Sequence, residues 1–204
     1  MSAPLLLATR SAGKLRELRP MFREARLDVI DLGDAGLAER PEESDIERSA
    51  TFEENALAKA RYFHQLAGGT PVLADDSGLE VAALGGAPGV RSKRWSGRLD
   101  LAGRALDDEN NRRLLDALAS AADRRARYVC VAAFVSERGE LVARGETAGR
   151  IVDAPRGANG FGYDPFFESA ELGRTFGELT RAEKERVSHR GRAFRRLLAA
   201  LRAG

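Results

Sequence analysis

The order of the hydrophobic patterns along the chain constrains its fold more than any other feature. Short apolar runs, which are typical of buried strands, occupy residues 4–9, 27–32 and 71–74, and segments with apolar residues at helical spacing lie between them. Further along, residues 128–135 and 141–152 flank a polar turn, as the two strands of a β-hairpin do. Strand–helix alternation favours parallel pairing, whereas a hairpin is antiparallel. The sequence therefore predicts an α/β protein with a mixed β-sheet and flanking helices.

Capping residues predict where two of the helices begin. Thr51 followed by Glu54 has the spacing of a capping box, and the helix that starts there is expected to end at Gly68. Thr180 followed by Glu183 repeats this pattern at the start of the C-terminal helical region. Both helices should therefore begin directly after a threonine.

The remaining helices are expected from their apolar residues. We expect Asp107 or Asp108 to cap a helix whose buried face includes Leu114. The last helix should bury Phe194 and Leu197. No linker separates these segments, so residues 1–204 are expected to form a single domain.

Composition excludes several classes of protein. The 33 Lys and Arg residues nearly balance the 31 Asp and Glu residues, so net charge does not indicate a nucleic-acid partner. No apolar run approaches the roughly 20 residues that span a bilayer, so we expect no membrane partner. The apolar run at residues 5–8 is shorter than a signal-peptide core, and the single cysteine, Cys130, fits a reducing compartment. We expect a cytoplasmic protein.

The scarcity of lysine is a further compositional signal. Only Lys14, Lys59, Lys93 and Lys184 accompany the many arginines. Arginine clusters such as that at residues 190–202 are therefore interpreted as solvated faces. If arginine stands wherever a positive charge is sufficient, the remaining lysines mark positions that need a compact ammonium group.

The segment from Thr9 to Lys14 is the first candidate site. It joins a predicted strand to a predicted helix, and the backbone N–H groups at a helix N-terminus can bind an anion. The spacing is not that of a P-loop. The alternative interpretation is a simple surface turn.

Asp75 and Asp76 are the second candidate, because they directly follow a predicted buried strand. We expect Asp75 to Gly78 to form a turn at the strand end, where α/β proteins bind ligands. Two adjacent carboxylates repel each other unless a divalent cation such as Mg²⁺ lies between them. The alternative is an Asx-turn with one solvated aspartate.

Two further candidates lie in the last quarter of the chain. Residues 157–167 are rich in glycine and aromatic residues, which would let a planar ligand approach the backbone and stack, or would simply fill a core. His189 lies between Lys184 and Arg190 in sequence, which suits phosphates or base carbonyls. A lone histidine is otherwise more often structural.

Six motifs in one order give the sequence a family resemblance. They occupy residues 9–14, 51–56, 74–78, 85–89, 161–164 and 188–191. Together they resemble the inosine/xanthosine triphosphate pyrophosphatase family, and the resemblance covers residues 4–200. It implies an elongated mixed α/β fold with two lobes around a central nucleotide-binding cleft, a homodimer and a Mg²⁺ requirement. The implied reaction is hydrolysis of deaminated purine nucleoside triphosphates (ITP, dITP and XTP) to the monophosphate and pyrophosphate.

The resemblance also implies roles for individual residues. Glu47 and Asp76 would be metal ligands, and Asp76 would accept the proton of the attacking water. The triphosphate would contact residues 9–14, and the base would lie against residues 161–164 with its 6-oxo edge facing His189 and Arg190. The full set of implied substrate contacts is Thr9, Arg10, Ser11, Ala12, Gly13, Lys14, Lys59, Ser77, Phe161, Gly162, Tyr163, Asp164, Lys184, His189 and Arg190.

The chain departs from the family pattern in its first loop. The family usually has Gly or His and then Asn where this chain has Arg10 and Ser11. Ser11 is shorter than Asn, and Arg10 could either compensate or point to solvent. Two rival functions stay open on the sequence: a Maf-like pyrophosphatase acting on other modified nucleotides, and a non-catalytic nucleotide- or RNA-binding module.

Overall fold

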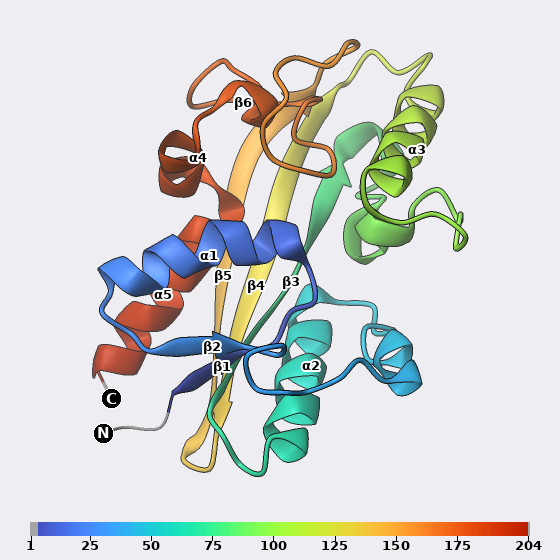
Figure 1. Ribbon diagram of the computed structural model, residues 1–204. Coiled ribbons are helices and arrows are strands. Elements are labelled where there is room, and N and C mark those ends of the chain that lie inside the picture. Colours follow the sequence, from blue (N-terminus) through green and yellow to red (C-terminus); the bar gives the residue numbers. More distant parts are fainter. Residues whose placement is uncertain (1–3, 204) are drawn as a thin grey trace. The chain divides into compact units, whose positions relative to one another are not determined.

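The structure is a computed structural model that describes residues 4–203 (Figure 1). A six-stranded sheet has the order β2-β1-β3-β4-β5-β6. The strands are β1 (Leu5–Leu7), β2 (Val29–Asp31), β3 (Val72–Val81), β4 (Arg125–Ser136), β5 (Gly139–Ile151) and β6 (Phe167–Ser169). Strand β1 is parallel to β2 and β3, whereas β5 and β6 are antiparallel. The predicted α/β class with a mixed sheet is confirmed.

Helices precede and follow these strands in the order that the sequence predicts. The α-helices are α1 (Ala12–Glu24), α2 (Phe52–Leu66), α3 (Gly103–Ala117), α4 (Arg181–Val187) and α5 (His189–Ala203). Short 3-10 helices are η1 (Pro41–Asp45), η2 (Ala82–Leu84), η3 (Gly89–Arg94) and η4 (Phe176–Glu178). No helix in the described part of the chain is both long and apolar enough to cross a membrane.

The predicted caps of α2 and α4 are present. The Thr51 hydroxyl accepts a hydrogen bond from the Glu54 N–H, and α2 ends just before Gly68, which has φ +61°. At α4, Thr180 and Glu183 bond reciprocally in a complete capping box. Local sequence thus determines both helix starts.

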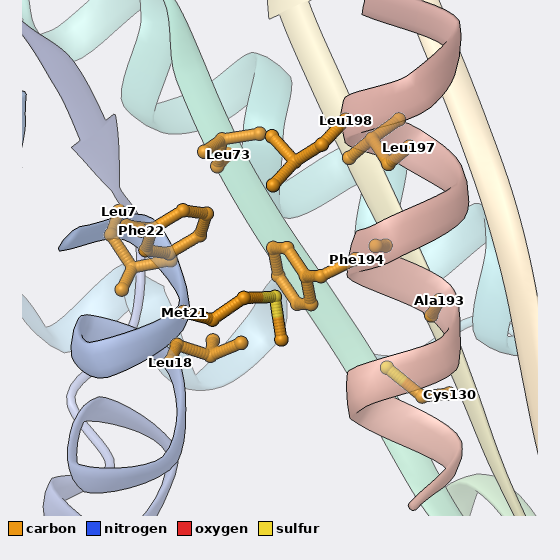
Figure 2. Packing of buried hydrophobic residues seen from close by; sticks show 11 residues of the cluster. Leu7, Leu18, Met21, Phe22, Leu73, Cys130, Ala193, Phe194, Leu197 and Leu198 are labelled. Atoms are coloured by element: carbon orange, nitrogen blue, oxygen red, sulfur yellow. The ribbon is translucent and has the colours of Figure 1, made fainter. Parts of the chain in front are cut away.

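The chain divides into two compact units. One comprises the described residues up to Asp76, Cys130–Gly145 and the chain from Ala193 on; the other comprises Ser77–Val129 and Glu146–Arg192. In the first unit, Leu18 and Phe22 of α1 pack against Phe194 and Leu197 of α5 (Figure 2). The Phe22 and Phe194 rings meet edge to face with centroids 5.6 Å apart. Burial of these apolar faces is the main source of helix stability here.

The second unit has its own hydrophobic core. Leu79 and Val81 of β3 lie in one cluster with Leu114 of α3, Tyr128 of β4 and Phe167 of β6. The Tyr128 and Phe167 rings are 4.7 Å apart. Leu114 is fully buried, which confirms the predicted apolar face of α3.

Three predicted boundaries are wrong. Asp75 to Gly78 do not form a turn but continue β3, because β3 pairs with β4 beyond the end of its pairing with β1 at Leu73, and Leu79 and Val81 are fully buried. Helix α3 begins at Gly103, so Asp107 and Asp108 lie inside it and do not cap it. Helix α1 already includes Ala12, so the segment from Thr9 to Lys14, predicted to join strand and helix, is a loop only as far as Ser11.

Candidate active site

Ser11 ends the loop after β1 and caps α1. Its side chain accepts a hydrogen bond from the Lys14 N–H at 3.3 Å, and its own N–H donates to Thr9 Oγ1 at 3.1 Å. Ala12 and Gly13 therefore lie in the first helical turn, which contains no acidic residue. A helix N-terminus of this kind, with a lysine in its first turn, has the polarity of an anion site.

The Arg10 side chain is bound by the acidic segment at residues 37–43. Its guanidinium donates to both carboxylate oxygens of Glu43, at 2.8 and 3.1 Å, and to the carbonyls of Leu37 and Ala38. It also lies 5.9 Å from the Phe63 ring centroid. The hydrogen bond to Glu43 raises the pKa of Arg10. This geometry gives Arg10 a structural role that its sequence position did not reveal.

Two lysines converge on Asp75 in the first unit. Lys14 Nζ lies 3.0 Å from Asp75 Oδ2, and Lys59 Nζ donates to the Asp75 carbonyl at 2.5 Å. Lys59 also forms an ion pair with Glu47. Burial disfavours the charge on Lys59, but Glu47, Asp75 and Asp76 outweigh burial and raise its pKa. Lys59 is therefore a buried ammonium group at neutral pH.

Asp76 lies next in the chain and is only 6% exposed. Successive strand residues point to opposite faces, so Asp75 and Asp76 have different partners. Asn55 Nδ2 donates to Asp76 Oδ2 at 2.9 Å, while Asn55 Oδ1 accepts from the Ser49 N–H. Burial and the negative charge of Glu47 raise the pKa of Asp76, against the opposing effects of Lys14, Lys59 and Asn55. A carboxylate in this setting is more basic than an exposed aspartate.

Glu47 and Asp76 fit a divalent cation. Burial opposes ionisation of Glu47, but Lys59 and Lys14 outweigh it and lower the pKa of Glu47, so this carboxylate stays charged. The described residues contain no group of three or more His, Cys, Asp and Glu side chains arranged for a metal. Two hard carboxylates are nonetheless a typical protein contribution to a Mg²⁺ site, because Mg²⁺ takes its remaining ligands from water and phosphate.

In the second unit, Asp164 organises the predicted base-binding segment. Its Oδ2 accepts from the Phe161 N–H at 2.8 Å and forms an ion pair with Lys184 at 2.5 Å. A Cβ at Gly160 would lie 2.0 Å from the same oxygen, so only glycine fits there. The segment is therefore shaped around one buried carboxylate.

Cations gather at the Phe161 ring. Lys184 Nζ lies 5.1 Å and Arg190 Cζ 5.7 Å from the ring centroid. Arg190 Nη2 also donates to Ser77 Oγ at 2.7 Å. An aromatic ring bordered by two cations can contact an anionic, planar ligand.

His189 begins α5 and is buried against aromatic rings. Its ring stacks on Tyr128 with centroids 4.5 Å apart and planes 6° apart, and Phe176 lies nearly parallel to both. Tyr163 is held differently, because its hydroxyl donates to the Ser92 carbonyl at 2.8 Å. Burial raises the pKa of Tyr163, so its hydroxyl stays protonated and able to donate this hydrogen bond.

The predicted site residues divide into two sets, one in each unit. The first set contains Thr9, Arg10, Ser11, Ala12, Gly13, Lys14, Glu47, Lys59 and Asp76. The second contains Ser77, Phe161, Gly162, Tyr163, Asp164, Lys184, His189 and Arg190. Lys93, the lysine without a predicted role, is exposed.

Sequence reasoning missed several polar residues that hold these groups in place. Asn55 contacts Asp76, and Glu43 contacts Arg10. Asp107 and Asn111 of α3 bind the backbone of Gly162. Asn55 and Asn111 occupy buried positions of their helices, so a polar residue within an apolar helical pattern is the signal that could have revealed them.

The described α/β fold combines buried carboxylates, a lysine at a helix start and an aromatic ring bordered by cations. These residue types are those that can bind phosphate and a divalent cation. The chain belongs to the Ham1 family, whose model matches residues 5–200. It is 48% identical over 201 residues to the dITP/XTP pyrophosphatase of Burkholderia pseudomallei, covering 97% of this chain and 92% of that one. Identity to the dITP/XTP pyrophosphatase of Mycobacterium tuberculosis is 50%, covering 98% and 95%. The solved structure of a HAM1 protein from Coxiella burnetii has a TM-score of 0.84 and 37% identity, with 100% of both chains covered.

Proposed function

We propose that this chain hydrolyses deaminated purine nucleoside triphosphates, namely ITP, dITP and XTP, to the monophosphate and pyrophosphate. The reaction would keep these nucleotides out of the cellular pool. The proposal is supported by the activity for which the relatives are named, since they match nearly the whole chain. The observation that carries it is the cluster of Lys14, Lys59, Glu47, Asp75 and Asp76, in which Lys59, Asp75 and Asp76 are buried.

The first unit would bind the triphosphate. Lys14 and the N-terminus of α1 would attract the phosphates, and Lys59 would offset the charge that develops on the leaving pyrophosphate. Glu47 and Asp76 would hold Mg²⁺, which when bound neutralises phosphate charge and polarises its ligands. Asp75 balances the charge of Lys14.

Asp76 would accept the proton of the attacking water. The water oxygen forms a bond to the α-phosphorus, and the bond from that phosphorus to the oxygen bridging to the β-phosphate breaks. This role is supported by the largely buried carboxylate of Asp76, which is a group able to act as a general base. Asn55, bonded to Asp76 Oδ2, would fix the direction of the carboxylate.

The second unit would recognise the base. Phe161 would stack on the purine ring, and His189 and Arg190 would donate hydrogen bonds to the 6-oxo group. An adenine presents an amino group at this position, which would leave the buried donors unpaired. Rejection of ATP would follow from that cost.

We further propose that residues 1–204 act as one pyrophosphatase domain, in a cytoplasmic homodimer. The match of the relatives over nearly their whole length supports the single domain. The homodimer rests on the family resemblance, and the cytoplasmic setting on the one buried cysteine and the location of nucleotide pools.

One assay tests the proposed activity against its rivals. Pyrophosphate release is measured with ITP, ATP, dTTP and UTP, with and without Mg²⁺. We expect rapid turnover of ITP that depends on Mg²⁺, and much slower turnover of ATP. Faster turnover of dTTP or UTP would indicate a Maf-like enzyme, and nucleotide binding without turnover would indicate a binding module.

A further inference from the structure

Helix α3 carries polar residues on a face that is largely buried. Asp107, Asn110 and Asn111 lie three and four residues apart, so they share one side of the helix. Asn110 and Asn111 are 4% and 6% exposed. Buried polar groups of this kind need partners, and the proposed reaction uses none of the three.

Asp107 and Asn111 both bind the backbone of Gly162. Asp107 Oδ2 accepts from the Gly162 N–H at 2.8 Å, and Asn111 Nδ2 donates to the Gly162 carbonyl at 2.9 Å. The peptide groups on both sides of this glycine are therefore fixed by one turn of α3. Asn110 binds a different loop, since it contacts the Ser96 N–H and the Lys93 carbonyl.

Gly162 is the position of its segment that most needs such support. It has φ +61°, and it lies within a tight turn closed by a 3.3 Å hydrogen bond from the Asp164 N–H to the Phe161 carbonyl. A glycine has many accessible backbone conformations, so the turn alone restrains it weakly. The orientation of the Phe161–Gly162 peptide also sets the direction of the Phe161 side chain, whose ring lies near Lys184 and Arg190.

The two polar groups of the Asn111 side chain differ in their hydrogen bonding, because the amide nitrogen binds Gly162 and the amide oxygen does not. Its Oδ1 is buried and has no hydrogen-bond partner among residues 4–203. Such an orphaned acceptor is destabilising. An unfavourable group at a residue whose other polar atom binds Gly162 indicates a role in placing the turn.

We propose that Asp107 and Asn111 are positioning residues that clamp the Gly162 peptide groups, orient Phe161 and thereby set the base selectivity of the purine site. This inference rests on the proposed function. Neither residue is a catalytic group, because both act through the backbone of Gly162. Loss of the clamp should weaken the recognition of ITP more than the chemical step.

The chemistry of the two hydrogen bonds allows variants that retain or remove each bond separately. Asp107 needs only an acceptor, so Asp107→Asn retains the bond through its amide oxygen, whereas Asp107→Ala loses it. Asn111→Leu removes the bond to Gly162 and also the orphaned acceptor. The partly exposed Gly162 can be hydrated in that variant. Asp108→Ala is the matched control, because Asp108 lies on α3 with a side chain that is 71% exposed.

The test is steady-state kinetics with ITP and ATP, together with amide hydrogen exchange at Gly162. In Asp107→Ala and Asn111→Leu we expect KM for ITP to rise about tenfold, the value of one good hydrogen bond, with kcat changed by less than about threefold. The ratio of kcat/KM for ITP to that for ATP should fall accordingly. Asp107→Asn and Asp108→Ala should resemble the unchanged protein. The double variant should lose little more than either single variant, because both act on one glycine.

Two readouts separate this proposal from a purely structural role and from failure of the proposed function. Asn111→Leu should unfold at the same or a higher temperature while losing selectivity, and faster Gly162 exchange should accompany each loss. A lower unfolding temperature with an unchanged ratio of kcat/KM for ITP to that for ATP, or failure of Asp107→Asn to retain that ratio, would overturn the clamp.

If the unchanged protein hydrolyses no ITP, the proposed function fails. In that case the loss of Gly162 protection still reports whether the clamp exists. If Asp107→Ala does not fold, Asn111→Leu alone decides the matter.

Discussion

At the scale of single residues, the role of each polar side chain depends on the group that it contacts more than on its residue type. Arg10 and Ser11 depart from the usual family loop, and both have structural roles, since Arg10 binds Glu43 and Ser11 caps α1. Asp75 and Asp76 are neighbours in sequence with different partners, Lys14 and Asn55. Only one of two adjacent carboxylates is thus a candidate base.

Asp76→Asn should abolish turnover while nucleotide binding is retained. The amide keeps the shape of the side chain but has neither the charge nor the basicity of a carboxylate. We expect kcat for ITP to fall at least about 100-fold, or about 2.7 kcal/mol, with calorimetry showing nucleotide affinity largely unchanged. Asp116→Asn, on an exposed side chain of α3, is the control. More than about a tenth of the original rate would contradict the role of Asp76.

Lys14→Arg tests whether the scarce lysines mark sites that need a compact ammonium. Lys14 Nζ lies close to two atoms of Asp75, the carboxylate at 3.0 Å and the carbonyl at 3.3 Å, and a broad planar guanidinium does not fit that space equally well. We expect kcat/KM for ITP to fall about tenfold or more, roughly 1.4 kcal/mol. Lys93→Arg should leave kcat/KM for ITP nearly unchanged, because Lys93 is exposed. Equal kinetics for the two variants would mean that any positive charge suffices.

At the scale of elements, the start of α4 is held by a charged capping box. Glu183 accepts from Arg174 and from the Thr180 N–H, and these bonds lower its pKa from 4.5 to about 2. A carboxyl whose pKa is lower in the folded state stabilises the fold above the unfolded pKa. That contribution is lost as the pH falls from about 4.5 to about 2.

Glu183→Gln should therefore reduce stability at pH 7 and have a smaller effect at low pH. Glutamine keeps a carbonyl oxygen for the cap but loses the charge that binds Arg174. Because Glu183 lies at the surface, we expect a small decrease in Tm at pH 7 that disappears as the pH approaches 2. Thermal unfolding of both proteins between pH 7 and about pH 2 measures this difference in Tm. A difference in Tm that is the same at every pH would show that the charge of Glu183 contributes nothing.

At the scale of the whole molecule, the chain divides its proposed activities between two units. The first contains the buried carboxylates and ammonium groups of the phosphate chemistry, and the second contains the aromatic rings around His189. Asp76→Asn in the first unit should consequently lower kcat for ITP, whereas His189→Ala in the second unit should change the selectivity between ITP and ATP.

His189→Ala should narrow the selectivity between ITP and ATP. Loss of a donor to the 6-oxo group weakens ITP recognition, while ATP, which has no such acceptor, is little affected. We expect kcat/KM for ITP to fall at least about tenfold more than that for ATP, or about 1.4 kcal/mol. Measurement of kcat/KM for both substrates at the same Mg²⁺ concentration decides the role of His189. An equal fall for the two substrates would assign His189 to phosphate binding or to structure.

The sequence by itself determined the α/β class, the helix starts at Thr51 and Thr180, and the apolar faces that bury Leu114 and Phe194. These features depend on local hydrogen bonds and on residue spacing within one element, and both can be recognised without knowing the neighbours. The family motifs added the candidate residues but not their partners.

Only the tertiary structure decided the path of β3 and the partners of the polar residues. Asp75 to Gly78 resemble a turn locally, but pairing with β4 extends β3 through them. Arg10 meets Glu43, and Asp107 meets Gly162, across 33 and 55 residues of chain. The energy of a buried hydrogen bond depends on which group the fold brings opposite it, and no local pattern contains that information.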